Sequence, residues 1–206
     1  MGLTATTSGT SYKSVPPGTY SARCFKVIDL GTQKRDYNGK VSYAHQVMIV
    51  WELPTELIEE GEYAGQPYAV AKFYTLSLHE KANLRKDLEA WRGRAFSEEE
   101  LKGFDLHNII GKPCMVSVIH SDTGKTKVNG VMALVRGMTL HEAINPSVVF
   151  DIDKWDDATF DSFSDGIKEI IKRSEEARFK GEKIDRSVEY DEASPSPYDI
   201  GSDIPF

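Results

Sequence analysis

The sequence is poor in the residues on which metal sites and disulfide frameworks depend. Its 206 residues include only two cysteines and five histidines. The histidines occur singly, with no His-Glu-x-x-His motif and no cysteine pair at zinc spacing, so we expect no metal site and no cofactor. Cys24 and Cys114 lie in apolar, strand-like runs. We expect both to be buried small hydrophobic residues.

Catalytic motifs are also lacking. Gly124-Lys125-Thr126 resembles the end of a phosphate-binding loop, but Ile119 stands where that motif requires its first glycine. The run 98–100 contains three glutamates, yet consecutive helical residues point in different directions. Such a run is better explained as favourable charge at a helix N-terminus. We therefore do not expect an enzyme.

No apolar run approaches the ~20 residues that a membrane-spanning helix needs. Residues 1–13 lack the apolar centre of a signal peptide, so we expect a cytoplasmic protein without membrane contact. Hydrophobic residues make up 40% of the chain and charged residues 28%, which is typical of a folded domain. The length favours one core domain with appendages.

The charge is unevenly distributed. The net charge is −7, but residues 1–145 hold 17 basic and 16 acidic residues. Residues 146–206 hold 8 basic and 16 acidic residues, and residues 187–206 contain no Lys or Arg. The acidic excess therefore belongs to the end of the chain, a pattern typical of an interaction tail.

Five strands are expected, at 20–30, 41–53, 68–76, 114–120 and 127–135. In the first, Tyr20, Ala22, Cys24, Ile28 and Leu30 are placed on one face. The dipeptide at 38–39, Asn-Gly, predicts a tight hairpin between the first two strands. Proline at 54 is expected to end the second strand.

One helix is expected between the third and fourth strands. Ser77 and Glu80 fit a capping box at its start, and Gly93 is placed to end it. A second capping box, at 97–100, predicts a short turn. This order of elements is that of the OB-fold, a five-stranded Greek-key barrel.

The chain is thus divided into a flexible arm at 1–14, an OB-fold domain at 15–145, a helical extension at 146–181 and an acidic, disordered tail at 182–206. In the extension, Phe160, Phe163, Ile167, Ile170 and Ile171 follow a helical period, interrupted by Gly166. This amphipathic helix needs a surface to cover, either on its own barrel or on a second subunit, so a homodimer is possible.

OB-folds bind single-stranded nucleic acids on their second and third β-strands and on the adjoining loops. There cations follow the phosphates, while aromatic rings stack on bases at roughly 1–3 kcal/mol per base. The candidate nucleic-acid-binding residues are Arg23, Phe25, Lys34, Arg35, Tyr37, Lys40, Lys72, Tyr74, Lys125 and Lys127. The strand aromatics are equally compatible with a core role, whereas the cluster around 34–40 is expected in a loop, which has no core to fill.

The last four residues are Asp203, Ile204, Pro205 and Phe206. A solvating tail explains the acidic charge but not the two large apolar groups. Two apolar anchors, a restrictive proline and carboxylates suit docking into a basic-rimmed apolar pocket of a partner.

This tip resembles that of bacterial single-stranded DNA-binding proteins, whose acidic tails end in Asp-Ile-Pro-Phe and recruit replication, recombination and repair enzymes. Gly201 and Ser202 depart from that family, which has more aspartates there, and imply a lower partner affinity. The body, over roughly 15–136, is similar to bacteriophage single-stranded DNA-binding proteins. The residues that carry this similarity include Pro17-Gly18-Thr19-Tyr20, Trp51-Glu52-Leu53, Trp91-Arg92-Gly93 and Gly111-Lys112-Pro113-Cys114.

The resemblance implies a phage protein that coats single-stranded DNA with little sequence preference during DNA replication or recombination in the host cytoplasm. Its tail would recruit partner enzymes. The alternative is an OB-fold protein-interaction module whose tail is a recruitment peptide, without significant DNA binding.

Overall fold

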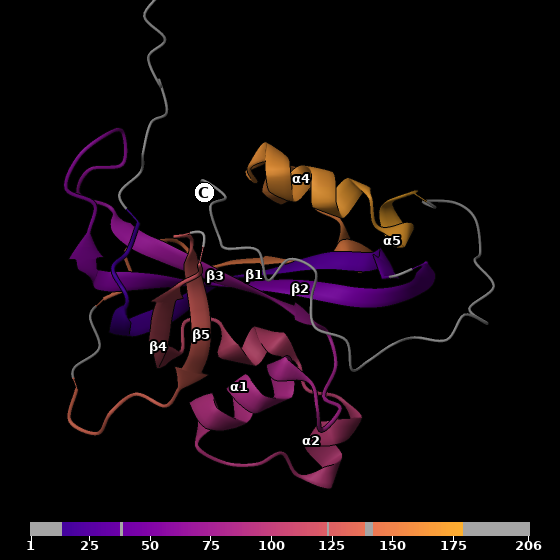
Figure 1. Cartoon of the computed structure of the whole chain (residues 1–206), viewed down its shortest axis with the longest axis horizontal. Helices are drawn as coiled ribbons and strands as arrows, with labels where there is room; N and C mark the ends of the chain where they lie inside the picture. Colours follow the sequence, from indigo (N-terminus) through magenta and orange to yellow (C-terminus); the bar gives the residue numbers. More distant parts are fainter. Residues whose placement is uncertain (1–13, 38, 123, 139–141, 179–206) are drawn as a thin grey trace, which may run out of the picture.

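The computed structural model describes residues 14–37, 39–122, 124–138 and 142–178. The predicted arm therefore lies outside the described residues except for Ser14, as do the acidic tail and its tip at 203–206. The described chain is mainly β, with a six-stranded open sheet and a few short helices (Figure 1). None of the described helices is long and apolar enough to cross a membrane.

The sheet has the strand order β3-β2-β1-β4-β5. Its strands are β1 (Gly18–Tyr37), β2 (Lys40–Leu57), β3 (Pro67–Thr75), β4 (Pro113–His120) and β5 (Thr126–Met132). These five pair antiparallel, whereas the short β6 (Val148–Phe150) runs parallel to the middle of β1. No ladder of backbone hydrogen bonds joins β3 to β5 in the described residues, so the sheet is not closed into a barrel.

Strand β1 serves both halves of the sheet. Its first residues pair with β4 up to Arg23, and Lys26–Ile28 pair with β6. Between them the register with β2 shifts by one residue at Phe25, which forms a β-bulge. Because side chains alternate along a strand, an extra residue moves the following side chains to the opposite face.

The bulge overturns the single apolar face expected for residues 20–30. Ala22, Cys24 and Val27 point into one core, whereas Ile28 and Leu30 lie in a second core with Phe25. Both faces of the central sheet are therefore covered. In Figure 1, the helices α1 and α2 lie on one side of β1 and β2, and α4 and α5 on the other.

The first core contains α1 (Asn83–Arg92), which buries Leu84, Leu88 and Trp91. Gly93 ends this helix in the left-handed region, at a φ of 68°, as predicted. The helix does not begin at the predicted capping box, however, because the Ser77 hydroxyl accepts a hydrogen bond from the amide of His79 instead. The second capping box is confirmed at the start of α2 (Glu98–Lys102), which precedes a 3-10 turn, η1 (Leu106–Ile109).

Both cysteines are buried and free, as predicted. Burial raises the pKa of each thiol. No cluster of His, Cys, Asp and Glu suited to a metal ion occurs among the described residues.

Two further predicted boundaries are wrong. Pro54 does not end β2, which continues to Leu57 through a register shift against β3. A bulge tolerates proline because it has no ladder bond to lose there. The predicted helix of the extension is broken into α3 (Asp157–Asp161), α4 (Asp165–Lys172) and α5 (Glu175–Arg178), preceded by η2 (Ile152–Lys154).

The break falls at Ser162–Ser164 because serines favour helix ends, where their hydroxyls bond to nearby backbone. The Ser162 hydroxyl donates to the carbonyl of Thr159 at 2.6 Å, while Phe163 turns into the second core. The surface that α4 covers is the sheet of its own chain. Seven buried apolar side chains between residues 150 and 171 contribute to that core, and each stabilises the fold by about 1.5–3 kcal/mol.

Candidate nucleic-acid interface

A two-stranded ribbon extends beyond the sheet at the end of β1 and the start of β2. Strand β3 stops at Thr75, opposite Gln46, but the pairing of β1 with β2 continues from Thr32–His45 to Tyr37–Lys40. Strand β1 ends at Tyr37 and β2 begins at Lys40, so the chain turns where the Asn-Gly dipeptide predicts. Gly39 adopts a φ of 77°, and its amide donates to the Asp36 carboxylate at 3.1 Å.

The predicted cluster at 34–40 thus lies on strands rather than in a loop, and alternation divides it between two faces. Lys34 shares one face with Tyr43, its cross-strand partner, and both remain outside the two cores. Lys34 and Lys40 are exposed. The side chain of Tyr37 lies outside the described part of the chain.

Arg35 is turned inward. It is 7% exposed, and its Nη2 donates to the Thr75 hydroxyl at 2.9 Å. Arg35 therefore ties the base of the ribbon to the end of β3 and has little surface left for a phosphate.

The second predicted cluster, on β3, is an internal network. Lys72 and Tyr74 do share a face, as predicted, but that face packs against α1. The Asp87 carboxylate accepts from Lys72 Nζ at 2.8 Å and from the Tyr74 hydroxyl at 2.7 Å. Burial, followed by the negative charge of Asp87, raises the pKa of Tyr74 well above its usual value.

Lys72 also connects the two edges of the sheet. Its Nζ donates to the carbonyl of Asn129 on β5 at 3.2 Å and lies 5.4 Å from the centre of the Tyr74 ring. Only 12% of the Lys72 side chain is exposed. Lys72 therefore holds β3, α1 and β5 together.

Two of the predicted stacking aromatics are buried in this structure. Phe25 is 3% exposed, under the C-terminal segment, and Tyr74 is 2% exposed. Neither ring offers a face to a base. Tyr43 is one of the strand aromatics that are compatible with a core role. In the structure it is half-buried on the ribbon, opposite Lys34.

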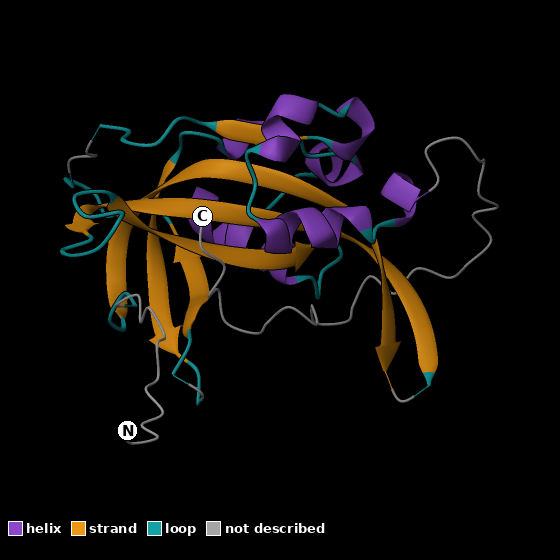
Figure 2. Cartoon of the chain, turned by 90° about the horizontal axis from the view of Figure 1, so that it is seen from above, coloured by secondary structure: helices purple, strands orange, loops and turns teal. Residues whose placement is uncertain are grey.

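The hairpin between β4 and β5 carries the remaining predicted cations. Its turn is closed by bonds between Ser121 and Lys125, with Gly124 at a φ of 78°. Lys125 and Lys127 are half-exposed, as is Arg23 near the start of β1. In Figure 2, this hairpin and the ribbon project toward the same side of the molecule, at the lower edge of the view.

The base of the ribbon is fastened to α5. Glu176 accepts hydrogen bonds from the amide and the hydroxyl of Thr32, each at 2.7 Å. On the same face of the ribbon, His45 Nε2 lies 2.6 Å from an Asp29 oxygen, and His45 Nδ1 lies 3.7 Å from a Glu176 oxygen.

This cluster should respond to pH. Burial alone would lower the pKa of His45, but the hydrogen bond to Asp29 and the charges of Asp29, Glu176 and Asp153 outweigh it and raise the pKa. Burial would raise the pKa of Glu176, but its bonds to Thr32 and the His45 charge lower it. His45 therefore contributes its full stabilisation of the fold at a pH below 6.5, the usual pKa of histidine. Glu176 contributes its full stabilisation at a pH above 4.5, the usual pKa of glutamate.

We therefore expect His45→Gln to reduce the free energy of unfolding by about 1–2 kcal/mol at pH 6, the range for a charge-assisted hydrogen bond that is partly solvated. The difference from the parent chain should shrink as the pH rises through the folded pKa of His45, because the native ring then loses its charge. Urea denaturation at pH 6 and pH 8.5 measures both differences. His79→Gln, at an exposed site, is the control; an equal, pH-independent loss in both variants would contradict the prediction.

The chain matches no protein-family model and no curated protein.

Proposed function

We propose that the chain binds single-stranded DNA with little sequence preference, through the ribbon and the β4–β5 hairpin. The observation that carries this proposal is a ribbon that projects beyond the sheet and carries exposed cations. Lys34 and Lys40 are exposed cations of the ribbon, and Asp36 is the single carboxylate within residues 32–45. Exposed cations of this kind follow a phosphate backbone without reading its sequence.

The order of elements supports an open form of the OB-fold. Strand β1 is shared between β2 and β4, and α1 lies between β3 and β4 in the chain. Lys72 bridges the gap between β3 and β5, the position at which such a barrel would close. In this proposal the protein is of the phage type and acts in DNA replication or recombination in the host cytoplasm, and the tip at 203–206 recruits partner enzymes.

The proposal places the DNA away from the central sheet. The C-terminal segment covers the face that carries Phe25 and Phe73. The DNA strand would therefore run across the ribbon and the β4–β5 hairpin, with the half-buried Tyr43 as the ring that stacks on a base.

Titration of a fluorescent oligo(dT) tests this proposal. Affinity should fall steeply with salt, with a slope of log K against log[salt] of about −0.7 for each phosphate neutralised. Three to four such contacts predict a slope of roughly −2 to −3. No binding at low salt would remove the proposal.

One observation favours the alternative, a protein-interaction module. Phe25, Arg35 and Tyr74 are buried, so part of the predicted stacking and charge is committed to the fold. If oligo(dT) does not bind, the exposed edges of the ribbon and the tip remain as candidate protein-binding elements. A pull-down of replication enzymes with the same chain tests this alternative.

A further inference from the structure

A pocket of about 530 Å³ lies on the α1 side of the sheet, outside the ribbon and the β4–β5 hairpin. Its walls come from the connection between β3 and α1, the first turn of α1, and the segment from α2 to η1. Its size is within the ~300–1,000 Å³ typical of ligand pockets. The apolar side chains that line it are Leu76, Leu78, Leu84, Leu101, Phe104 and Leu106.

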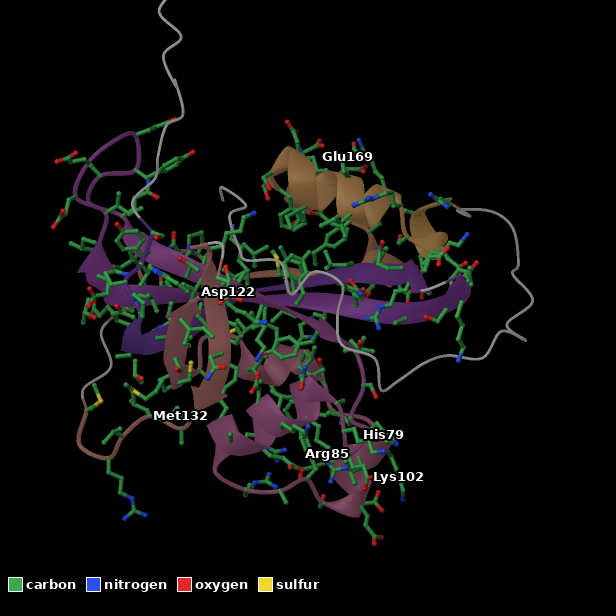
Figure 3. All side chains as sticks on the ribbon, in the orientation of Figure 1. His79, Arg85, Lys102, Asp122, Met132 and Glu169 are labelled. Carbon is green, nitrogen blue, oxygen red and sulfur yellow. The ribbon has the colours of Figure 1, made fainter. Side chains whose placement is uncertain are left out.

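Two basic side chains, Arg85 and His79, line the pocket, and no carboxylate is among the described residues that line it. Figure 3 shows both at the same end of the molecule, with Lys102 beside them. Leu76 is 42% exposed, so it offers an apolar surface at the rim of the pocket.

Both basic side chains are held in place. Arg85 donates from Nη1 to the carbonyl of Leu78 at 3.2 Å and from Nε to Glu89 at 3.0 Å. His79 Nδ1 accepts from the amide of Lys81 at 3.3 Å. In the neutral ring this leaves Nε2 as a donor. The pocket thus combines an apolar floor with oriented donors for an anion.

We infer that this pocket binds the tip of the same chain, residues 203–206. Ile204 and Phe206 supply apolar groups for the leucine-lined floor, and Asp203 supplies the carboxylate for Arg85 and His79. Pro205 restricts the peptide before it binds, which lowers the entropy lost on docking. Residues 187–206 carry five acidic residues and no Lys or Arg, so their approach to the Arg85 guanidinium is electrostatically favourable.

The connecting segment is long enough. About 25 residues separate Arg178, the last described residue, from the tip. A flexible chain of that length has an end-to-end distance of roughly 25–30 Å and a maximum reach of about 80–90 Å. The radius of gyration of a domain of this size is only about 15 Å, so the tip reaches the pocket from its own chain.

Docking within one chain has two consequences. The tether gives the tip an effective concentration in the millimolar range, so even a weak site is occupied. Because the pocket lies outside both hairpins, a docked tip leaves the proposed DNA path open. The inference thus goes beyond the proposed function and does not depend on DNA binding.

The test uses a fluorescein-labelled peptide of residues 198–206 and fluorescence polarisation. The receptor is the full chain carrying Ile204→Ser and Phe206→Ser, which removes the apolar groups of the competing tip and leaves every described residue unchanged. We expect saturable binding, and at least tenfold weaker binding to the unaltered chain, because its own tip occupies the pocket. Leu76→Glu in the receptor should weaken peptide binding at least tenfold, since it places a negative charge at the rim.

The matched control is Leu57→Glu, at a leucine that is 49% exposed at the far end of β2. A peptide with Phe206→Ser controls for labelling and cannot affect folding. The inference is overturned by no saturation at millimolar peptide, by equal binding to the unaltered chain, or by equal effects of Leu76→Glu and Leu57→Glu. Displacement of the peptide by oligo(dT) would place the tip on the DNA path and also overturn it, while oligo(dT) binding alone decides the proposed function.

Discussion

Replacing Lys34 and Lys40 together by glutamate is expected to lower the affinity for oligo(dT) by about 100-fold at low salt. Each substitution removes one cation from the phosphate path and adds a repulsive charge, an effect of about tenfold per position. Both side chains are exposed. The double variant should therefore fold like the parent chain, with unchanged urea denaturation.

The salt dependence separates a local contact from a general effect of charge. Loss of two phosphate contacts should reduce the slope of log K against log[salt] by roughly 1.4 in magnitude. The control is Lys81→Glu with Lys102→Glu, which changes the net charge by the same amount at exposed sites away from the ribbon. Equal loss of affinity in the two double variants would show that the ribbon has no special role.

Gly31→Ala is expected to be among the most destabilising single substitutions, at about 3–4 kcal/mol. Gly31 adopts a φ of 69°, which costs an L-residue roughly 1–2 kcal/mol. A Cβ there would also lie 2.6 Å from Ser174 Cβ and from Glu176 Oε2, and 2.8 Å from Ile152 Cδ1. These atoms belong to the segment that covers the second core, so the added methyl would push that segment away from β1.

Gly39→Ala provides the matched control. Gly39 has a similar φ of 77°, but nothing lies within 4 Å of the position of its Cβ. Its substitution should lower the free energy of unfolding by only the cost of the left-handed backbone conformation, about 1–2 kcal/mol. Urea denaturation of both variants isolates the cost of crowding, and equal losses would mean that the C-terminal segment does not press on β1.

The elements that were predictable are those with local signals. The Asn-Gly turn, the capping box at 97–100 and the glycine that ends α1 each depend on a few adjacent residues, and all three are where expected. The capping box at 77–80 failed because the Ser77 hydroxyl found a nearer amide, at His79. Local motifs compete with equally local alternatives.

The second core was not predicted, although its signal is visible in retrospect. Between Cys24 and Leu30, apolar residues occupy both odd and even positions. Such a run is typical of a strand that is buried on both faces, whereas simple alternation predicts a strand with one apolar face. The bulge at Phe25 lies where β1 changes its partner from β4 to β6, and these strands lie about 90 and 120 residues further along the chain.

For the candidate site, residue type was a good guide to charge but not to availability. Lys34 and Lys40 are exposed, as an interface requires. Arg35 lies between them in sequence but bonds to Thr75, 40 residues away. Lys72 and Tyr74 likewise serve Asp87. Only the tertiary contacts distinguish a cationic side chain that bonds to other parts of the fold from one that is exposed to solvent.

The residues that cover the second core come late in the chain, and this affects the nascent protein during synthesis. The sheet face that carries Phe25, Met48 and Phe73 is complete once β3 has been made, but its cover ends only at Ile171. At about 5–20 residues per second, the ribosome needs roughly 5–20 s to make that stretch. During this time an apolar sheet surface lacks its cover. Truncated chains released with an end before Ile171 should therefore aggregate, whereas released chains that end after Arg178 should not.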